Sequence, residues 1–172
     1  NSTGTNVQTL RNYYIYADDI DSDGILELPG LIEMKLPEAT AAAENQHLIR
    51  WFSMASDGME TDRLCTYHNF IGGWYLQLDS TLASRFCVIP KGSSYEFAIW
   101  DEDFTQPQTL VTIYVLTGQK REEQALTDNR FVLHRTDSTV YAAKLEVASA
   151  AYGMSRDEIG RASCRERVFL DV

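Results

Sequence analysis

Acidic residues alternate along one short stretch of this chain, and that stretch constrains the local fold more than any other feature. It reads DIDSDGILE, with Asp19, Asp21 and Asp23 in alternation, Gly24 after them and Glu27 at its end. Glycine reaches left-handed backbone conformations without the steric cost of a Cβ atom, so Gly24 favours a sharp turn. Alternate acids on a tightly curved loop direct several carboxylates inward, and Ca²⁺ is bound by about six to eight oxygen atoms. The stretch therefore predicts a calcium-binding loop.

The ligand spacing excludes an EF-hand, whose loop needs a bidentate Glu at its twelfth position. Counted from Asp19, that position is Gly30. The loop instead resembles those of FG-GAP and VCBS repeats, which lie between strands of integrin-like β-propeller blades. Their ligands occupy the first, third, fifth, seventh and ninth loop positions. The resemblance implies one Ca²⁺ held by the side chains of Asp19, Asp21, Asp23 and Glu27 and by the backbone carbonyl of Ile25. A metal-free acidic hairpin turn is the alternative, in which these acids repel one another.

Two wider resemblances divide the chain into two expected domains. Residues 10–70, with the acidic loop, Trp51-Phe52 and Asp57-Gly58, are similar to the end of such a repeat region in secreted or lipid-anchored bacterial proteins. Residues 71–157 resemble a PsbP-like domain, an α/β/α sandwich on an antiparallel sheet, through the order of their elements. An α+β domain of another type is the alternative. These resemblances imply a propeller-blade-like segment at residues 1–70 and a second domain at 71–157.

The end of the chain resembles no protein family. Residues 158–168, EIGRASCRERV, match the in-frame translation of a common short-read sequencing adapter. A natural basic amphipathic tail is the alternative. We interpret residues 158–172 as a non-native, adapter-derived tail, and segments of this kind are set aside in reasoning about a fold. We expect them to pack poorly or to extend the preceding helix, and to add nothing to the fold.

Strand patterns dominate the chain and predict a strand-dominated α+β fold with two or three short helices. The expected strands are residues 11–17, 30–36, 47–55, 62–68, 74–78, 86–89, 94–100, 108–116, 130–135 and 139–147. The expected helices are residues 79–85, capped by Asp79 or Ser80, residues 119–126, and residues from 148 onward. Residues 37–46 fit a helical turn or a surface loop. Asp57-Gly58 between apolar runs predicts a β-hairpin.

The charge of the chain argues against two classes of partner, and its cysteines argue against a disulfide. The net charge of −10 argues against nucleic acid, because phosphate binding needs clustered Lys and Arg, and against docking on an anionic membrane surface. No apolar run approaches the ~20 residues of a membrane-spanning helix. Cys65 and Cys87 lie in apolar strand-like runs, which favours buried thiols over a disulfide between them.

Motifs for catalysis are absent from the sequence: it has no G-x-S-x-G, P-loop, G-x-G-x-x-G or H-E-x-x-H pattern. Cys65 and His68 have the spacing of a zinc-ligand pair, but zinc usually needs a second pair. The acids at 101–103 fit a glycosidase carboxylate pair less well than a solvated turn. Four aromatic residues fit core packing better than a sugar-binding platform: Trp51, Trp74, Tyr75 and Trp100.

We therefore expect a non-enzymatic extracellular or cell-envelope module with a structural calcium loop and an unknown protein or glycan partner. The first residues, NSTGT, resemble a linker without a signal peptide, so we interpret the chain as a fragment of a longer bacterial surface protein or lipoprotein. The alternative is an accessory domain of a larger secreted enzyme that acts on cell walls or glycans. An enzyme within this chain is a third, less favoured hypothesis.

Overall fold

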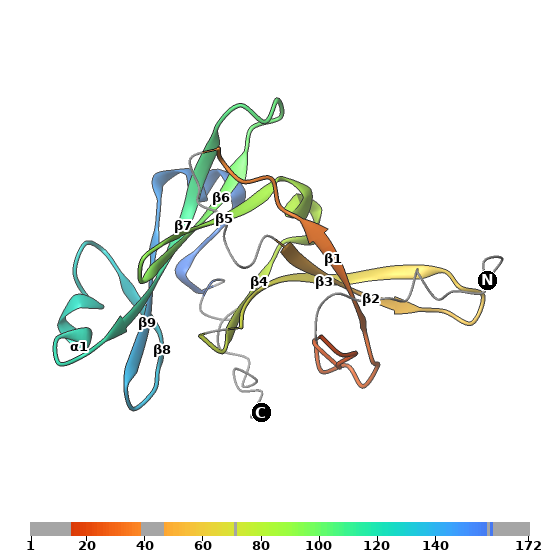
Figure 1. Cartoon of the computed structure of the whole chain (residues 1–172), viewed down its shortest axis with the longest axis horizontal. Coiled ribbons are helices and arrows are strands. Elements are labelled where there is room, and N and C mark those ends of the chain that lie inside the picture. Colours follow the sequence, from red (N-terminus) through yellow and green to blue (C-terminus); the bar gives the residue numbers. More distant parts are fainter. Residues whose placement is uncertain (1–14, 39–46, 71, 158, 160–172) are drawn as a thin grey trace.

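Two antiparallel β-sheets make up the computed structural model, which describes residues 15–38, 47–70, 72–157 and 159 (Figure 1). The first sheet has the strand order β1-β2-β3-β4, and the second has the order β5-β6-β7-β9-β8. The first sheet contains β1 (Leu28–Glu33), β2 (His47–Met54), β3 (Glu60–Asn69) and β4 (Trp74–Leu78). The second contains β5 (Phe86–Lys91), β6 (Ser94–Trp100), β7 (Pro107–Thr117), β8 (Phe131–Arg135) and β9 (Thr139–Leu145). This arrangement confirms the predicted strand-dominated class.

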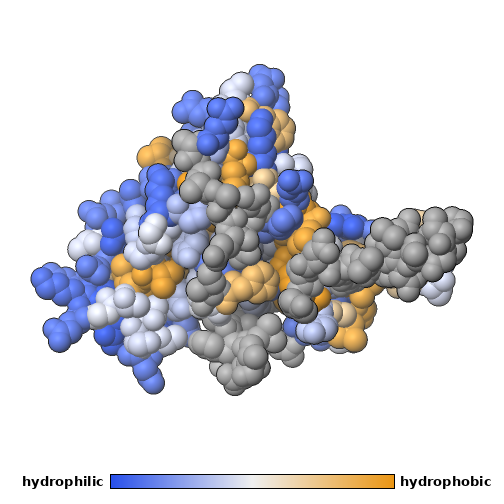
Figure 2. Space-filling model, viewed as in Figure 1, coloured by the Kyte–Doolittle hydropathy of each residue, from blue (hydrophilic) through white to orange (hydrophobic). Residues whose placement is uncertain are grey.

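The helices in the described part of the chain are short. They are η2 (Ser80–Arg85) and η3 (Val147–Tyr152), both 3₁₀, and α1 (Arg121–Gln124). Asp79 caps η2 by accepting a hydrogen bond from the Thr81 N–H, as predicted. Figure 2 shows hydrophilic residues gathered around α1, which buries none of its residues. No helix among the described residues is long and apolar enough to cross a membrane.

Several expected boundaries differ from the observed ones. β1 begins at Leu28 and ends at Glu33, whereas alternation placed that strand at residues 30–36. Residues 15–17, the described part of the strand expected at 11–17, lie in no strand. Most of the turn or loop expected at 37–46 lies outside the described residues. The β2–β3 hairpin turns at Gly58, whose φ of +84° is the left-handed conformation predicted by the Asp-Gly pair.

One hydrophobic core joins the two sheets. β4 pairs with β3, so the first sheet extends to Leu78, beyond the boundary expected after residue 70. Tyr67 of β3 packs edge-on against Phe97 of β6, with ring centroids 5.3 Å apart. Trp74 of β4 packs in the same way against Tyr95, with ring centroids 5.2 Å apart. Side chains from both sheets therefore belong to a single buried cluster.

Lys35 provides a second link between the sheets. Its backbone carbonyl accepts a hydrogen bond of 2.7 Å from the Trp100 indole N–H. Its ammonium group donates to the Phe104 carbonyl at 3.1 Å and lies 5.0 Å from the ring centroids of Trp100 and Phe104. The segment after β1 is thereby held against the loop between β6 and β7.

The outer face of the first sheet carries its own apolar cluster. It consists of Ile49, Trp51 and Leu64, with Ile15 and Ile20 packed against it. Trp51 is only 2 % exposed, and its indole N–H donates to the Thr66 hydroxyl at 2.8 Å. This outer cluster, defined by those five residues, places the acidic loop next to the sheet because Ile20 belongs to the loop.

One residue of the expected non-native tail contributes to the main core. Ile159 is 6 % exposed and belongs to the cluster shared by both sheets. The expectation that residues 158–172 add nothing to the fold is therefore wrong for Ile159. The other residues of that segment lie outside the described part of the chain.

Candidate metal centre

A single antiparallel bridge closes the acidic loop. The Glu27 N–H donates to the Asp18 carbonyl at 2.9 Å, and the Asp18 N–H donates to the Glu27 carbonyl at 3.2 Å. Between them, Ser22 and Gly24 have positive φ angles of +63° and +86°. A Cβ atom at Gly24 would meet nothing within 4 Å, so its left-handed backbone, not lack of space, favours glycine there.

Backbone N–H groups hold the aspartate carboxylates in place. Both carboxylate oxygens of Asp19 accept hydrogen bonds, one from the Asp23 N–H at 2.9 Å and one from the Gly24 N–H at 3.0 Å. Asp21 accepts from the Asp23 N–H at 3.2 Å, and Asp23 accepts from the Ile25 N–H at 2.8 Å. The loop therefore orients its acids through its own backbone, and each carboxylate oxygen keeps further acceptor capacity.

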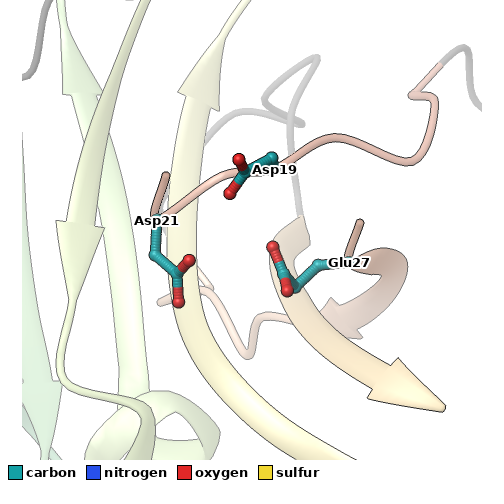
Figure 3. Close-up of side chains that lie close together, drawn as sticks. All are labelled: Asp19, Asp21 and Glu27. Atoms are coloured by element: carbon teal, nitrogen blue, oxygen red, sulfur yellow. The ribbon is translucent and has the colours of Figure 1, made fainter. Parts of the chain in front are cut away.

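Three carboxylates converge on one point. Asp19, Asp21 and Glu27 each offer an oxygen atom, and these atoms lie within 4.8 Å of one another. Figure 3 shows the three side chains directed toward a common space from the two sides of the loop. Among the described residues, this is the one group of His, Cys, Asp and Glu side chains arranged to hold a metal ion.

Glu27 is the unusual member of this group because it is fully buried, with 0 % of its surface exposed. One of its carboxylate oxygens, Oε2, accepts a hydrogen bond from the Ile20 N–H at 3.2 Å. The other, Oε1, is buried and has no hydrogen-bond partner. Burial raises the pKa of Glu27; the Ile20 N–H opposes this, and the charges of Asp21, Asp23 and Asp19 raise it further. A buried carboxylate oxygen in such surroundings is stabilised by a proton or by a cation.

One of the four predicted side-chain ligands, Asp23, does not join this group. Asp23 is exposed, and its Oδ2 atom lies 3.8 Å from a guanidinium nitrogen of Arg63 on β3. Arg63 also donates to the Ser53 hydroxyl at 3.1 Å, which ties Asp23 to the edge of the β2–β3 hairpin. The carbonyl of Ile25 remains a predicted ligand. Sequence reasoning missed Arg63, because nothing in its local pattern shows that it faces the loop.

The structure places the other candidate residues in structural roles. Asp101 accepts hydrogen bonds from the hydroxyl and the N–H of Thr105, which lower its pKa and form an exposed turn. Cys65 and Cys87 are buried free thiols, as predicted. Burial lowers the pKa of His68 to about 4, and its ring stacks on Tyr75 with centroids 5.0 Å apart. Trp51, Trp74 and Trp100 are buried, in agreement with core packing.

No protein-family model, curated protein or solved structure matches this chain.

Proposed function

We propose that this chain is a non-enzymatic extracellular or cell-envelope module, part of a longer bacterial surface protein or lipoprotein, whose acidic loop binds one structural Ca²⁺. The observation that supports this most is the unpartnered, buried Oε1 atom of Glu27, a residue whose carboxylate converges with those of Asp19 and Asp21. An acidic cluster on an exposed loop has a simple alternative as a solvated surface. A buried carboxylate with an unpartnered oxygen is different, because its desolvation has to be offset by an opposite charge or by a proton.

The donor atoms fit calcium. All of them are oxygens, which suit hard cations such as Ca²⁺ and Mg²⁺, whereas Zn²⁺ favours histidine and cysteine ligands. Asp19, Asp21 and Glu27 supply carboxylates from the converging group. The Ile25 carbonyl is a further ligand of the proposal, and Asp23, which lies beside Arg63 and outside the converging group, is the remaining residue of the expected set. Mg²⁺ demands near-ideal octahedral geometry, whereas Ca²⁺ accepts irregular shells completed by water, so an incomplete set of loop oxygens favours calcium.

Weak binding matches an extracellular location. A single loop with few protein ligands is expected to bind Ca²⁺ with a dissociation constant on the order of 10⁻⁵–10⁻³ M. Such a site fills only where calcium is close to millimolar, as it is outside cells. The role of the ion is structural in this proposal, because the loop joins directly to β1 and contacts the outer cluster of the first sheet.

Calorimetric titration of the whole chain with CaCl₂ tests the proposal. We expect binding with a stoichiometry of one ion per chain, and at least tenfold weaker binding for Asp21→Asn and for Glu27→Gln. Asp137→Asn is the matched control, because Asp137 is an exposed turn acid outside the loop. Equal heats for the original chain and the two loop variants would exclude this loop as the calcium site.

A further inference from the structure

The acidic loop does more than present ligands, because it also covers part of a sheet. Ile15 and Ile20 pack on Ile49, Trp51 and Leu64, which belong to β2 and β3. Residues 15–27 therefore form a cap, which we define as this segment, over the outer face of the first sheet. Glu27, at the end of the cap, is buried at the point where the chain enters β1.

We propose that calcium binding and the covering of Trp51 are one coupled equilibrium, in which the ion holds the cap closed and its removal uncovers the outer cluster. This inference rests on the proposed calcium site and adds a conformational role to it. Two observations support the coupling: the cap holds both the converging carboxylates and the apolar side chains over Trp51, and Glu27 has a buried oxygen without a partner.

The closed cap is poorly stabilised without a cation. Its apolar contacts come from Ile15 and Ile20, which are both only partly buried. Closing it brings three carboxylates within 4.8 Å of one another and removes Glu27 from water. Like charges at this separation repel, and the repulsion is relieved when the cap opens to solvent. A bound divalent cation reverses the sign of that interaction, so the ion favours the closed state.

If calcium binding and closing of the cap are coupled, a substitution that loosens the cap affects calcium binding even when it changes no ligand. If calcium binds the closed cap, then weakening the apolar contacts of the cap must weaken calcium binding, because a smaller fraction of the chain is in the closed state. Ile20 supplies no side-chain ligand, and its backbone N–H to Glu27 is retained in an alanine variant. We therefore expect Ile20→Ala to bind Ca²⁺ several-fold more weakly. Ile89→Ala is the matched control, because Ile89 is a partly buried isoleucine of β5 packed on a different cluster.

The covering of Trp51 is measured by ¹⁹F NMR on the whole chain labelled with 5-fluorotryptophan. The chain has three tryptophans, and a Trp51→Phe variant assigns the resonance of interest. We expect calcium removal to shift the Trp51 resonance and to increase its solvent-isotope shift. The resonances of Trp74 and Trp100, which lie in other buried clusters, are expected to stay in place.

The two proposals fail in different ways. Calcium binding with an unmoved Trp51 resonance, and with equal affinity for the original chain and Ile20→Ala, overturns the coupled cap and leaves the calcium site intact. If calorimetric titration detects no heat of calcium binding, the proposed function itself is wrong. A weaker affinity for Ile20→Ala but not for Ile89→Ala, together with the selective shift of Trp51, supports the coupled equilibrium.

Discussion

We expect that replacing Glu27 by glutamine stabilises the chain without calcium and weakens the stabilisation that calcium provides. Glutamine keeps the shape of the side chain and one oxygen to accept the Ile20 N–H, which now bonds to Glu27 Oε2. Its amide nitrogen takes the position of the unpartnered Oε1 atom, on a side chain whose carboxylate converges with those of Asp19 and Asp21. Without metal, the substitution therefore removes a buried charge from a group of like charges.

The gain without calcium follows from the spacing of the charges. At the 4.8 Å limit on the separation of the carboxylate oxygens, two unit charges repel by about 3 kcal/mol at an effective dielectric constant of about 20, and by about 1 kcal/mol in bulk water. Asp19 and Asp21 are half-buried, so water screens part of this repulsion. We expect Glu27→Gln to stabilise the calcium-free chain by about 1 to 3 kcal/mol.

The loss with calcium follows from mass action. For a dissociation constant of about 10⁻⁴ M and about 5 mM free calcium, binding stabilises the folded chain by about 2.3 kcal/mol. For a chain of this length, that corresponds to a rise in melting temperature of about 5–9 °C. Glu27→Gln removes a charged ligand, and binding at least tenfold weaker limits its calcium-dependent stabilisation to about 1 kcal/mol or less, under half that of the original chain. The two chains should melt at similar temperatures in calcium and differ in chelator.

Thermal unfolding followed by circular dichroism, in EDTA and in 5 mM CaCl₂, measures both effects. Asp137→Asn removes the same kind of charge from an exposed turn and should follow the original chain in both buffers. The reasoning is refuted if Glu27→Gln melts below the original chain in EDTA, because the buried carboxylate would then have a stabilising partner. It is equally refuted if calcium raises the melting temperature of both chains by the same amount.

Three further predictions concern the rest of the molecule. Burial lowers the pKa of His68 to about 4 in the folded chain, against an ordinary value of 6.5, so the stability contributed by its neutral ring is full above pH 6.5 and is lost as the pH falls through 4. His68→Phe should therefore remove about 3 kcal/mol of acid sensitivity, measured by urea unfolding across that range. Lys35→Ala should lower the melting temperature by about 2–4 °C through loss of its contact over Trp100, whereas Lys35→Arg should lower it less, as calorimetry can show. A chain that ends at Asp157 lacks the buried Ile159 and should lose about 2 kcal/mol of stability in urea unfolding, whereas an unchanged midpoint would mean that this side chain contributes nothing.

The strands were predictable because their signal is local. Apolar alternation and turn residues identify β2, β4, β6, β7 and the β2–β3 hairpin within a few residues of their observed bounds. The sheet to which β4 belongs was not predictable in this way. Gly72-Gly73 marks a turn, and a turn within a sheet looks the same in sequence as a boundary between domains. The structure pairs Asn69 with Trp74 across that turn, so β3 continues into β4 in the first sheet.

In the acidic loop, too, the sequence indicates what depends on neighbouring residues but not what depends on contacts with the sheet. Spacing alone indicates that Asp19, Asp21 and Glu27 converge, because alternation on a tight loop is a local property. Asp23 lies outside this group and 3.8 Å from Arg63, which is forty residues further along the chain on β3. The burial of Glu27 and the packing of Ile20 on Trp51 depend on where the loop lies against the sheet.

Strand register explains why Glu27 cannot relieve its burial by turning to solvent. In β1, Pro29 lies opposite Trp51 and Leu31 lies opposite Ile49, so these positions share the outer face with the cluster around Trp51. Glu27 precedes Pro29 by two residues, and side chains two apart in an extended chain point to the same face. Exposing Glu27 by a one-residue shift would turn every side chain of β1 to the opposite face. Asp23, outside any strand, is free of this constraint and lies beside Arg63. The buried acid is therefore fixed by the sheet, and its charge has to be balanced where it lies, by a proton or by the cation that we propose.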